Sequence, residues 1–143
     1  MPTYVVRTYP GRLDAEQKQA FVDSITRTHA EEAGGVPQWL VSVIFEEVAK
    51  DSWFINKKPA PAEQIWVRGD IRGGRTDAQR QSICKRITAE CAPHAKVDSS
   101  YIWVYICDIE AASEFGAVLP EPGQEKAWVE NLGKDVRERY GLY

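Results

Sequence analysis

The sequence predicts an α+β fold, in which a duplicated β-α-β unit forms a four-stranded mixed sheet with two helices on one face, plus a short C-terminal helix. Two observations predict it. Short segments of the first half recur in the same order in the second half, at an offset of about 61 to 63 positions. Each copy also has the residue pattern of a strand, a helix and a strand. The length of 143 residues fits one domain containing both copies.

Four pairs of segments carry the repeat, and four such pairs in one order are not expected by chance. They are Tyr4–Arg7 with Ile65–Arg68, Gly11–Ala15 with Gly74–Ala78, Ile25–Thr26 with Ile87–Thr88, and Val43–Val48 with Val104–Ile109. The repeat divides the single domain 1–143 into a first β-α-β unit at 2–48, a linker at 49–62, a second unit at 63–109 and a C-terminal segment at 110–143.

The first copy shows all three elements clearly. Residues 3–8 are β-branched and aromatic, which is typical of a strand. Apolar residues at helical spacing predict a helix over 14–33, with Asp14 at its start to cap free backbone N–H groups. Gly34-Gly35 ends this helix, since glycine readily adopts the left-handed conformation found there. Residues 39–48 are predicted to form the second strand.

The second copy repeats this pattern with a strand at 64–71, a helix at 77–92 and a strand at 100–109. Between the copies, residues 56–61 contain a lysine pair and two prolines, which indicate an exposed linker. After the second copy, a short amphipathic helix is predicted over 124–139.

The predicted sheet has one face that its own helices do not cover. Strand residues 102–106 are apolar at both alternating sets of positions, so both faces of the sheet favour burial. Two helices cover only one face. We therefore expect the chain to form a homo-oligomer that packs sheets together, although the strand pattern does not fix the number of subunits.

Composition argues against several classes of function. The net charge of −3 gives no electrostatic basis for binding nucleic acid or an anionic membrane. No apolar run approaches the roughly 20 residues that span a bilayer, and the first residues lack a secretion signal. The three cysteines form no CxxC pair, and the two histidines are far apart. We expect a cytoplasmic protein without a metal or cofactor.

One set of stretches carries a family resemblance from Pro2 to about Trp128. They are Met1-Pro2 before the first strand, Leu40–Glu47, Ile65–Arg75, Ile102–Ile106, Glu114–Gly116 and Leu119–Gly123. Together with the duplicated unit, they resemble the tautomerase superfamily, and within it the cis-3-chloroacrylic acid dehalogenase group. The resemblance implies the tautomerase fold, a homotrimer and an active site at Pro2, whose nitrogen becomes a free amine when Met1 is removed.

The resemblance implies a substrate-binding role for three residues around the catalytic Pro2. His29 matches a histidine beside the substrate carboxylate. Arg72 and Arg75 match an arginine pair that holds this carboxylate, which suits the guanidinium group because it binds carboxylates through two parallel hydrogen bonds. A free α-amino group titrates near neutral pH, so the Pro2 amine is able to act as a general acid or a general base.

The resemblance also matches Tyr105 and Glu114 to a pair that activates water. The segment between them is shorter than in the dehalogenase, and Phe115 stands where a tyrosine is usual. Each matched residue also has an ordinary structural explanation. Pro2 would be a common processed start, and His29 a packing residue of its helix. Arg72 and Arg75 would form an exposed basic turn, Tyr105 would be an ordinary strand aromatic, and Glu114 a solvated loop carboxylate.

These matches imply an enzyme that acts on small unsaturated or 2-oxo carboxylic acids. A protonated Pro2 would support hydration, or dehalogenation when the substrate carries a halogen, and a neutral Pro2 would support keto-enol tautomerisation. The alternative is a non-catalytic, oligomeric, protein-binding member of the superfamily, particularly if Met1 is retained, because the Pro2 nitrogen is then an amide.

Overall fold

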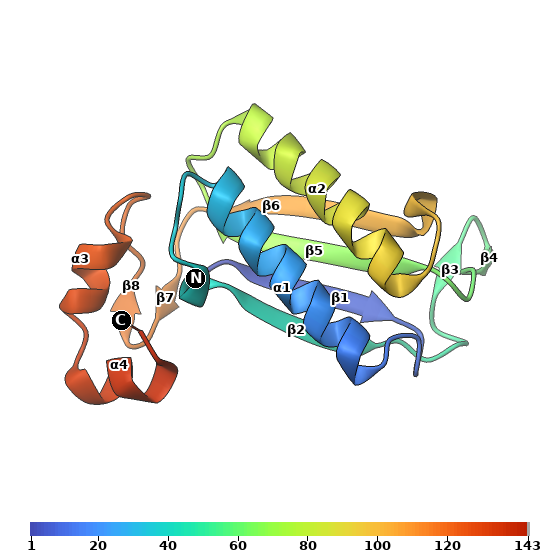
Figure 1. The fold of residues 1–143 in the computed structure, drawn as a ribbon, viewed down its shortest axis with the longest axis horizontal. Coiled ribbons are helices and arrows are strands. Elements are labelled where there is room, and N and C mark those ends of the chain that lie inside the picture. The colour runs from blue at the N-terminus through green and yellow to red at the C-terminus, as the bar shows by residue number, and fades with distance from the viewer. Residues whose placement is uncertain (143) are drawn as a thin grey trace.

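The computed structural model describes residues 1–142, and it contains two successive strand-helix-strand units (Figure 1). The first consists of β1 (Thr3–Thr8), α1 (Ala15–Glu32), the 3-10 turn η1 (Gln38–Leu40) and β2 (Ser42–Glu47). The second consists of β5 (Ile65–Arg72), α2 (Asp77–Ala95), the 3-10 turn η2 (Ser99–Tyr101) and β6 (Ile102–Ile109). The other elements are β3 (Phe54–Ile55), β4 (Lys58–Pro59), β7 (Ser113–Glu114), β8 (Ala117–Val118), α3 (Glu125–Glu130) and α4 (Lys134–Tyr140).

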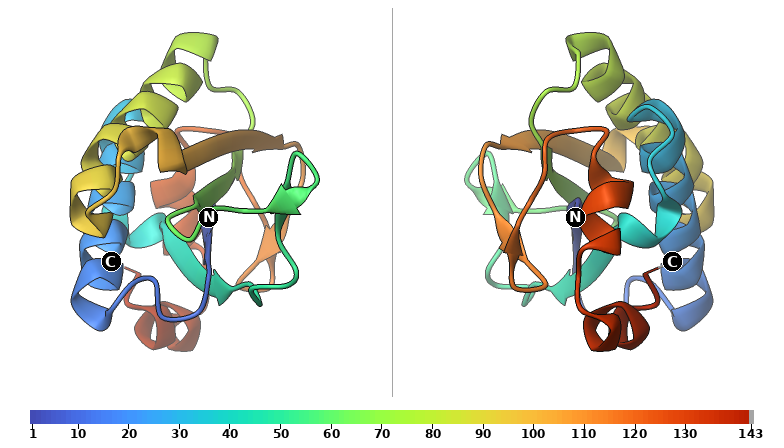
Figure 2. Two further views of the ribbon diagram at one scale, coloured as in Figure 1. Left: turned by 90° about the vertical axis from the view of Figure 1, so that its right-hand side faces the viewer. Right: turned by 90° about the vertical axis from the view of Figure 1, so that its left-hand side faces the viewer.

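The main sheet has four strands in the order β2-β1-β5-β6. Each unit contributes a parallel pair, and the two units join through the antiparallel pair β1 and β5. Helices α1 and α2 lie side by side on one face of this sheet (Figure 2). The predicted α+β fold, with a mixed sheet and two helices on one face, is confirmed.

Both long helices begin with a reciprocal cap. At the start of α1, Asp14 accepts from the backbone N–H of Gln17, whose side chain accepts from the N–H of Asp14. Thr76 and Gln79 repeat this arrangement at the start of α2. Two of the free N–H groups at each helix start are thereby satisfied.

Helix α2 runs to Ala95, beyond the predicted end at residue 92. Its last carbonyl groups have no partner within the helix. Side chains near the start of α1 supply the missing donors: Gln17 donates to the carbonyl of His94, and Arg12 donates to the carbonyl of Ala95. This long-range capping extends the helix past Pro93.

The C-terminal segment corrects the prediction of one helix over 124–139. It forms two helices, α3 and α4, which are separated at Asn131–Gly133. The break lets α4 turn back, so that Leu142 packs against Val129 and Leu132 in a small cluster apart from the main core. One continuous helix could not bring these apolar groups together.

The segment between the two units is exposed at residues 56–59, as expected of a linker, but it is not irregular. It forms the short hairpin β3-β4, with its exposed turn at Asn56 and Lys57. Both turn residues have positive φ values, +50° and +65°, which match the tight turns that suit hairpins. The hydroxyl group of Tyr9 donates to the carbonyl of Ala60 and fixes the hairpin to the end of β1.

Side chains alternate strictly along the central strands. The positions of β1 and β5 that face the helices, among them Tyr4, Val6 and Val67, are fully buried. The opposite face has no covering layer in the described chain and leaves Ile44, Trp103 and Tyr105 exposed. None of the helices within residues 1–142 has the length and apolar character to cross a bilayer.

Gly69 in β5 leaves room for an aromatic side chain of the neighbouring strand. A Cβ atom at position 69 would lie 2.4 Å from Cε1 of Tyr4 and 3.0 Å from Cδ1 of Ile106. The first distance is far below van der Waals contact. The Tyr4 ring therefore depends on the missing side chain of Gly69.

We predict that Gly69→Ala lowers the free energy of unfolding by about 1–3 kcal/mol, because a methyl group must displace the buried Tyr4 ring. Denaturant unfolding monitored by circular dichroism measures the change. Gly73→Ala is the matched control, since its Cβ would make only an ordinary contact of 3.6 Å. Equal stability of the two variants would contradict the proposed close packing.

Candidate active site

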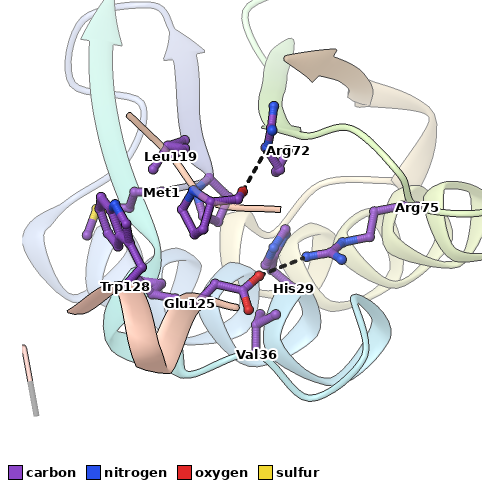
Figure 3. Close-up of a pocket in the computed structure, with 11 residues that line it drawn as sticks. Met1, His29, Val36, Arg72, Arg75, Leu119, Glu125 and Trp128 are labelled. Carbon is purple, nitrogen blue, oxygen red and sulfur yellow. Dashed lines mark hydrogen bonds and ion pairs between the residues drawn. The ribbon is translucent and has the colours of Figure 1, made fainter. Parts of the chain in front are cut away.

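Five parts of the chain converge at one end of the sheet. Thr3 pairs with Asp70, so the antiparallel register places the start of β1 beside the end of β5. The last turn of α1, the β5–α2 loop and α3 approach the same end. The cavity between them has about 450 Å³ of space, part of it open to solvent (Figure 3). It is lined by Met1, Pro2, His29, Val36, Leu40, Arg72, Arg75, Leu119, Pro120, Glu125 and Trp128.

His29 is a buried neutral group in the wall of this cavity. Its side chain is 2% exposed. Burial lowers the pKa of His29 to about 4, and the positive charges of Arg75 and the amino terminus act in the same direction. The imidazole is therefore uncharged near neutral pH and can serve as a hydrogen-bond donor without adding charge to the site.

Tyr4 determines which nitrogen of His29 carries the hydrogen. The Tyr4 hydroxyl lies 2.8 Å from Nδ1 of His29. Burial raises the pKa of Tyr4 well above its ordinary value, so the hydroxyl keeps its proton. Donation of this proton to Nδ1 satisfies the hydroxyl and leaves the single ring hydrogen of His29 on Nε2. The second ring nitrogen is then a fixed donor.

Arg72 lies in the cavity wall, but the chain itself uses its donors. Nε donates to the carbonyl of Pro120 at 3.1 Å, and Nη1 donates to the carbonyl of Glu110. Nη2 lies 3.3 Å from a carboxylate oxygen of Glu121. These bonds tie the end of β5 to the segments on both sides of the β7-β8 hairpin.

Arg75 has more capacity for an added ligand. Its Nε is buried without a hydrogen-bond partner in the described chain. Its Nη2 lies 3.9 Å from Glu125, a long ion pair whose two side chains are both largely buried. Figure 3 shows the Glu125 carboxylate directed at Arg75 across the cavity. The two arginines predicted to act as a pair are therefore engaged in different ways.

Glu114 lies beside the amino terminus. One of its carboxylate oxygens is 2.6 Å from the nitrogen of Met1. The residue ends β7, and the following turn has positive φ values at Phe115 and Gly116. Phe115 packs against Trp128, which anchors the hairpin that carries Glu114.

Tyr105 lies outside this group. It is half-exposed on the uncovered face of the sheet and packs edge-on against Trp66, with ring centroids 5.4 Å apart. It is not among the residues that line the cavity. The fold of one chain thus brings together Pro2, His29 and the two arginines, with Glu114 adjacent, and leaves Tyr105 apart.

Tyr4, Glu125 and Trp128 are among the residues of the site that were not identified from the sequence. Tyr4 had a usable signal, because a tyrosine on the buried face of a strand needs a partner for its hydroxyl. Glu125 and Trp128 had none, since they reach the cavity only through the path of the C-terminal segment. The described residues contain no cluster of three or more potential metal ligands.

Residues 1–132 match the family described as "Putative oxalocrotonate tautomerase enzyme". The structure of N1, a member of the cis-3-chloroacrylic acid dehalogenase family, is 31% identical, with 99% of each chain covered and a TM-score of 0.89. Native Ps01740 is 33% identical over 78% of this chain and 99% of its own, with a TM-score of 0.72.

More distant structures share the fold. The F6 fused 4-OT asymmetric trimer is 21% identical over 75% of this chain and 85% of its own, with a TM-score of 0.68. No curated protein matches the chain.

We predict that acid destabilises the protein through His29. The folded-state pKa of about 4 lies below the ordinary value of 6.5. Between these values the unfolded chain binds a proton that the folded chain does not, so the free energy of unfolding falls as the pH drops through this window, by up to about 3 kcal/mol. Denaturant unfolding from pH 7 to 4 should show a smaller loss in His29→Gln. The exposed His94→Gln serves as control, and an identical loss in all three proteins would refute the assignment.

We also predict that Glu125→Gln tightens the binding of a small carboxylate, such as propanoate, several-fold. The substitution removes the negative charge that now faces Arg75. Isothermal titration calorimetry measures the dissociation constant. Glu130→Gln, an exposed position on the same helix, should leave it unchanged. Unchanged affinity in both variants would mean that Glu125 does not compete for Arg75.

Proposed function

This chain belongs to the tautomerase superfamily, in its cis-3-chloroacrylic acid dehalogenase-like group, and from that premise we propose that it is an enzyme whose catalytic group is the amine of Pro2. Its substrates would be small unsaturated or 2-oxo carboxylic acids. One observation carries the proposal: Pro2 shares a cavity with Arg75 and a neutral His29, and Glu114 lies 2.6 Å from the amino terminus.

Removal of Met1 is the first requirement, because it converts the amide nitrogen of Pro2 into a secondary amine. This nitrogen is three bonds from the nitrogen of Met1, which limits their separation to about 4 Å. The new amine would therefore remain close to Glu114. It would also stay in the cavity that Arg75 and His29 line.

Hydration follows from the protonated form of Pro2. Arg75 would bind the substrate carboxylate, and Nε2–H of His29 would donate to the same group. Glu114 would take a proton from a water molecule while the oxygen of that water bonds to the β-carbon. Pro2 would give its proton to the α-carbon. With a halogen on the β-carbon, the adduct would release halide and a proton, and a carbonyl group would form.

Tautomerisation follows from the neutral form. Pro2 would take the proton from the hydroxyl group of a 2-oxo acid's enol form, and the protonated amine would then give it to the neighbouring carbon, which regenerates neutral Pro2. The positive arginines favour the neutral amine, whereas the Glu114 carboxylate favours the protonated amine. The pH dependence of kcat/KM for each reaction would identify the form that acts.

Tyr105 fits this chemistry only if the site includes a second subunit. Its hydroxyl belongs to the uncovered sheet face, where Ile44 and Trp103 are also exposed. We propose that this face packs against neighbouring protomers in a homotrimer and that Tyr105 reaches a neighbour's site. The fused 4-OT neighbour, described as a trimer, supports this assembly. The three free cysteines support a cytoplasmic location.

One observation favours the non-catalytic alternative. The Met1 side chain packs against the C-terminal cluster, and its ammonium group pairs with Glu114, so the unprocessed chain is well accommodated. In that form the Pro2 nitrogen has no lone pair available for proton transfer. The mass of the native protein separates the two functions.

We predict an intact mass that lacks one methionine and measurable turnover of phenylenolpyruvate, cis-3-chloroacrylate or both. Pro2→Ala should lower kcat/KM at least about 100-fold, because the ring-constrained secondary amine is lost. Pro10→Ala, at an exposed position outside the cavity, should keep full activity. A mass that retains Met1, with no turnover of either compound, would overturn the enzyme proposal.

A further inference from the structure

The side chain of Met1 occupies an apolar seat next to the catalytic position. It is 16% exposed and packs against the cluster of Val129, Leu132 and Leu142. Figure 3 shows it beside Trp128, which lines the same cavity. Apolar atoms of Leu40 and Leu119 also line this cavity. We refer to this site, formed by Leu40, Leu119, Trp128 and the cluster of Val129, Leu132 and Leu142, as the apolar seat. Its lining favours an apolar group.

This seat would become part of the active site in the processed chain, a step that rests on the function proposed above. Removing Met1 takes away its side chain together with its ammonium group. The surrounding residues come from η1, the segment after β8 and α3. They are held by their own contacts, among them the Phe115–Trp128 packing. Dry apolar cavities in proteins bind apolar ligands of matching size.

The position of the seat fixes where a substrate would carry its apolar group. The Cβ atom of Met1 is three bonds from the Pro2 nitrogen. A group that replaces the Met1 side chain must therefore begin within a few bonds of the atom that gives or takes the proton. Its place on the substrate is at, or next to, the reacting carbons.

The charges in the cavity limit the rest of the substrate to one carboxylate. Among its lining residues, the two arginines are the side-chain cations, and Arg72 is already bound to carbonyl groups and Glu121. Figure 3 shows Arg75 and Trp128 on opposite sides of the cavity. A second carboxylate at Trp128 would lose water without gaining a partner, which is unfavourable.

We propose that the site selects monocarboxylic acids that carry an apolar substituent, aryl or branched alkyl, at or next to the reacting carbons. The carboxylate binds Arg75, and the substituent takes the seat of Met1 against Trp128. Burial of a group of this size strengthens binding by roughly ten- to a hundredfold.

Unreactive saturated acids test the proposal without any need for turnover. Calorimetry on the chain that begins at Pro2 would compare propanoate, 3-phenylpropanoate and butanedioate. We expect 3-phenylpropanoate to bind at least ten times more tightly than propanoate, and butanedioate to show no such gain. In a chain made to begin at Met1, the filled seat should abolish the preference.

Two variants of the cavity wall and one control variant locate the effect. Trp128→Ala should reduce the ratio of the two affinities several-fold, while Trp53→Ala, in the segment before the β3-β4 hairpin, should preserve it. Leu119→Asn provides an independent change in the same wall and should also reduce it, so the test does not depend on Trp128→Ala remaining folded.

Equal affinities for propanoate and 3-phenylpropanoate, or a ratio that neither wall variant changes, would overturn the proposal. Turnover by an enzyme that shows no preference for 3-phenylpropanoate would refute the apolar seat and leave the proposed function intact. A preference in a chain that turns over no substrate would support the seat and count against the proposed function.

Discussion

The antiparallel pairing of β1 with β5 is the constraint on which the rest of the structure depends. It joins the two β-α-β units into one sheet, and its register, with Thr3 opposite Asp70, decides what meets at each end. A parallel pairing would put the starts of both strands together. The antiparallel pairing instead puts the amino terminus beside the end of β5 and the loop that carries Arg75. One cavity thus contains residues from both copies.

The same pairing makes the two copies unequal. The first begins at a chain end, where a free amine can form, and the second begins inside the chain. Repetition of the fold therefore does not repeat the chemistry. The C-terminal segment, which has no counterpart in the repeat, adds Glu125 and Trp128 beside the start of β1. Arg72 holds that segment in place through the carbonyl groups of Glu110 and Pro120.

Much of the fold could be predicted because it depends on local patterns. Strand alternation, the Asp14 cap and the glycines after α1 are each determined within a few residues of the chain. The continuation of α2 to Ala95 could not be predicted, because its cap comes from side chains more than 70 positions earlier. The division of the C-terminal helix could not be predicted either, since it depends on Leu142 reaching Val129.

In the candidate site, too, some features could be predicted from the sequence, and those that depend on distant segments could not. The six residues expected from the family resemblance include four that line the cavity and one, Glu114, at its edge. Their unequal engagement could not be predicted, since the carbonyl groups that occupy Arg72 come from distant segments.

The missing side chain at Gly69 links the histories of the two copies. Tyr4, in the first copy, fills the space that Gly69 leaves in the second, and the Tyr4 hydroxyl in turn sets the proton of His29. After a duplication, two repeats are ordinarily free to diverge separately. Here a side chain could be gained at position 69 only by a lineage that had already reduced the residue at position 4. The two positions are expected to change together, so homologues that differ in the residue at position 69 should also differ in the residue at position 4.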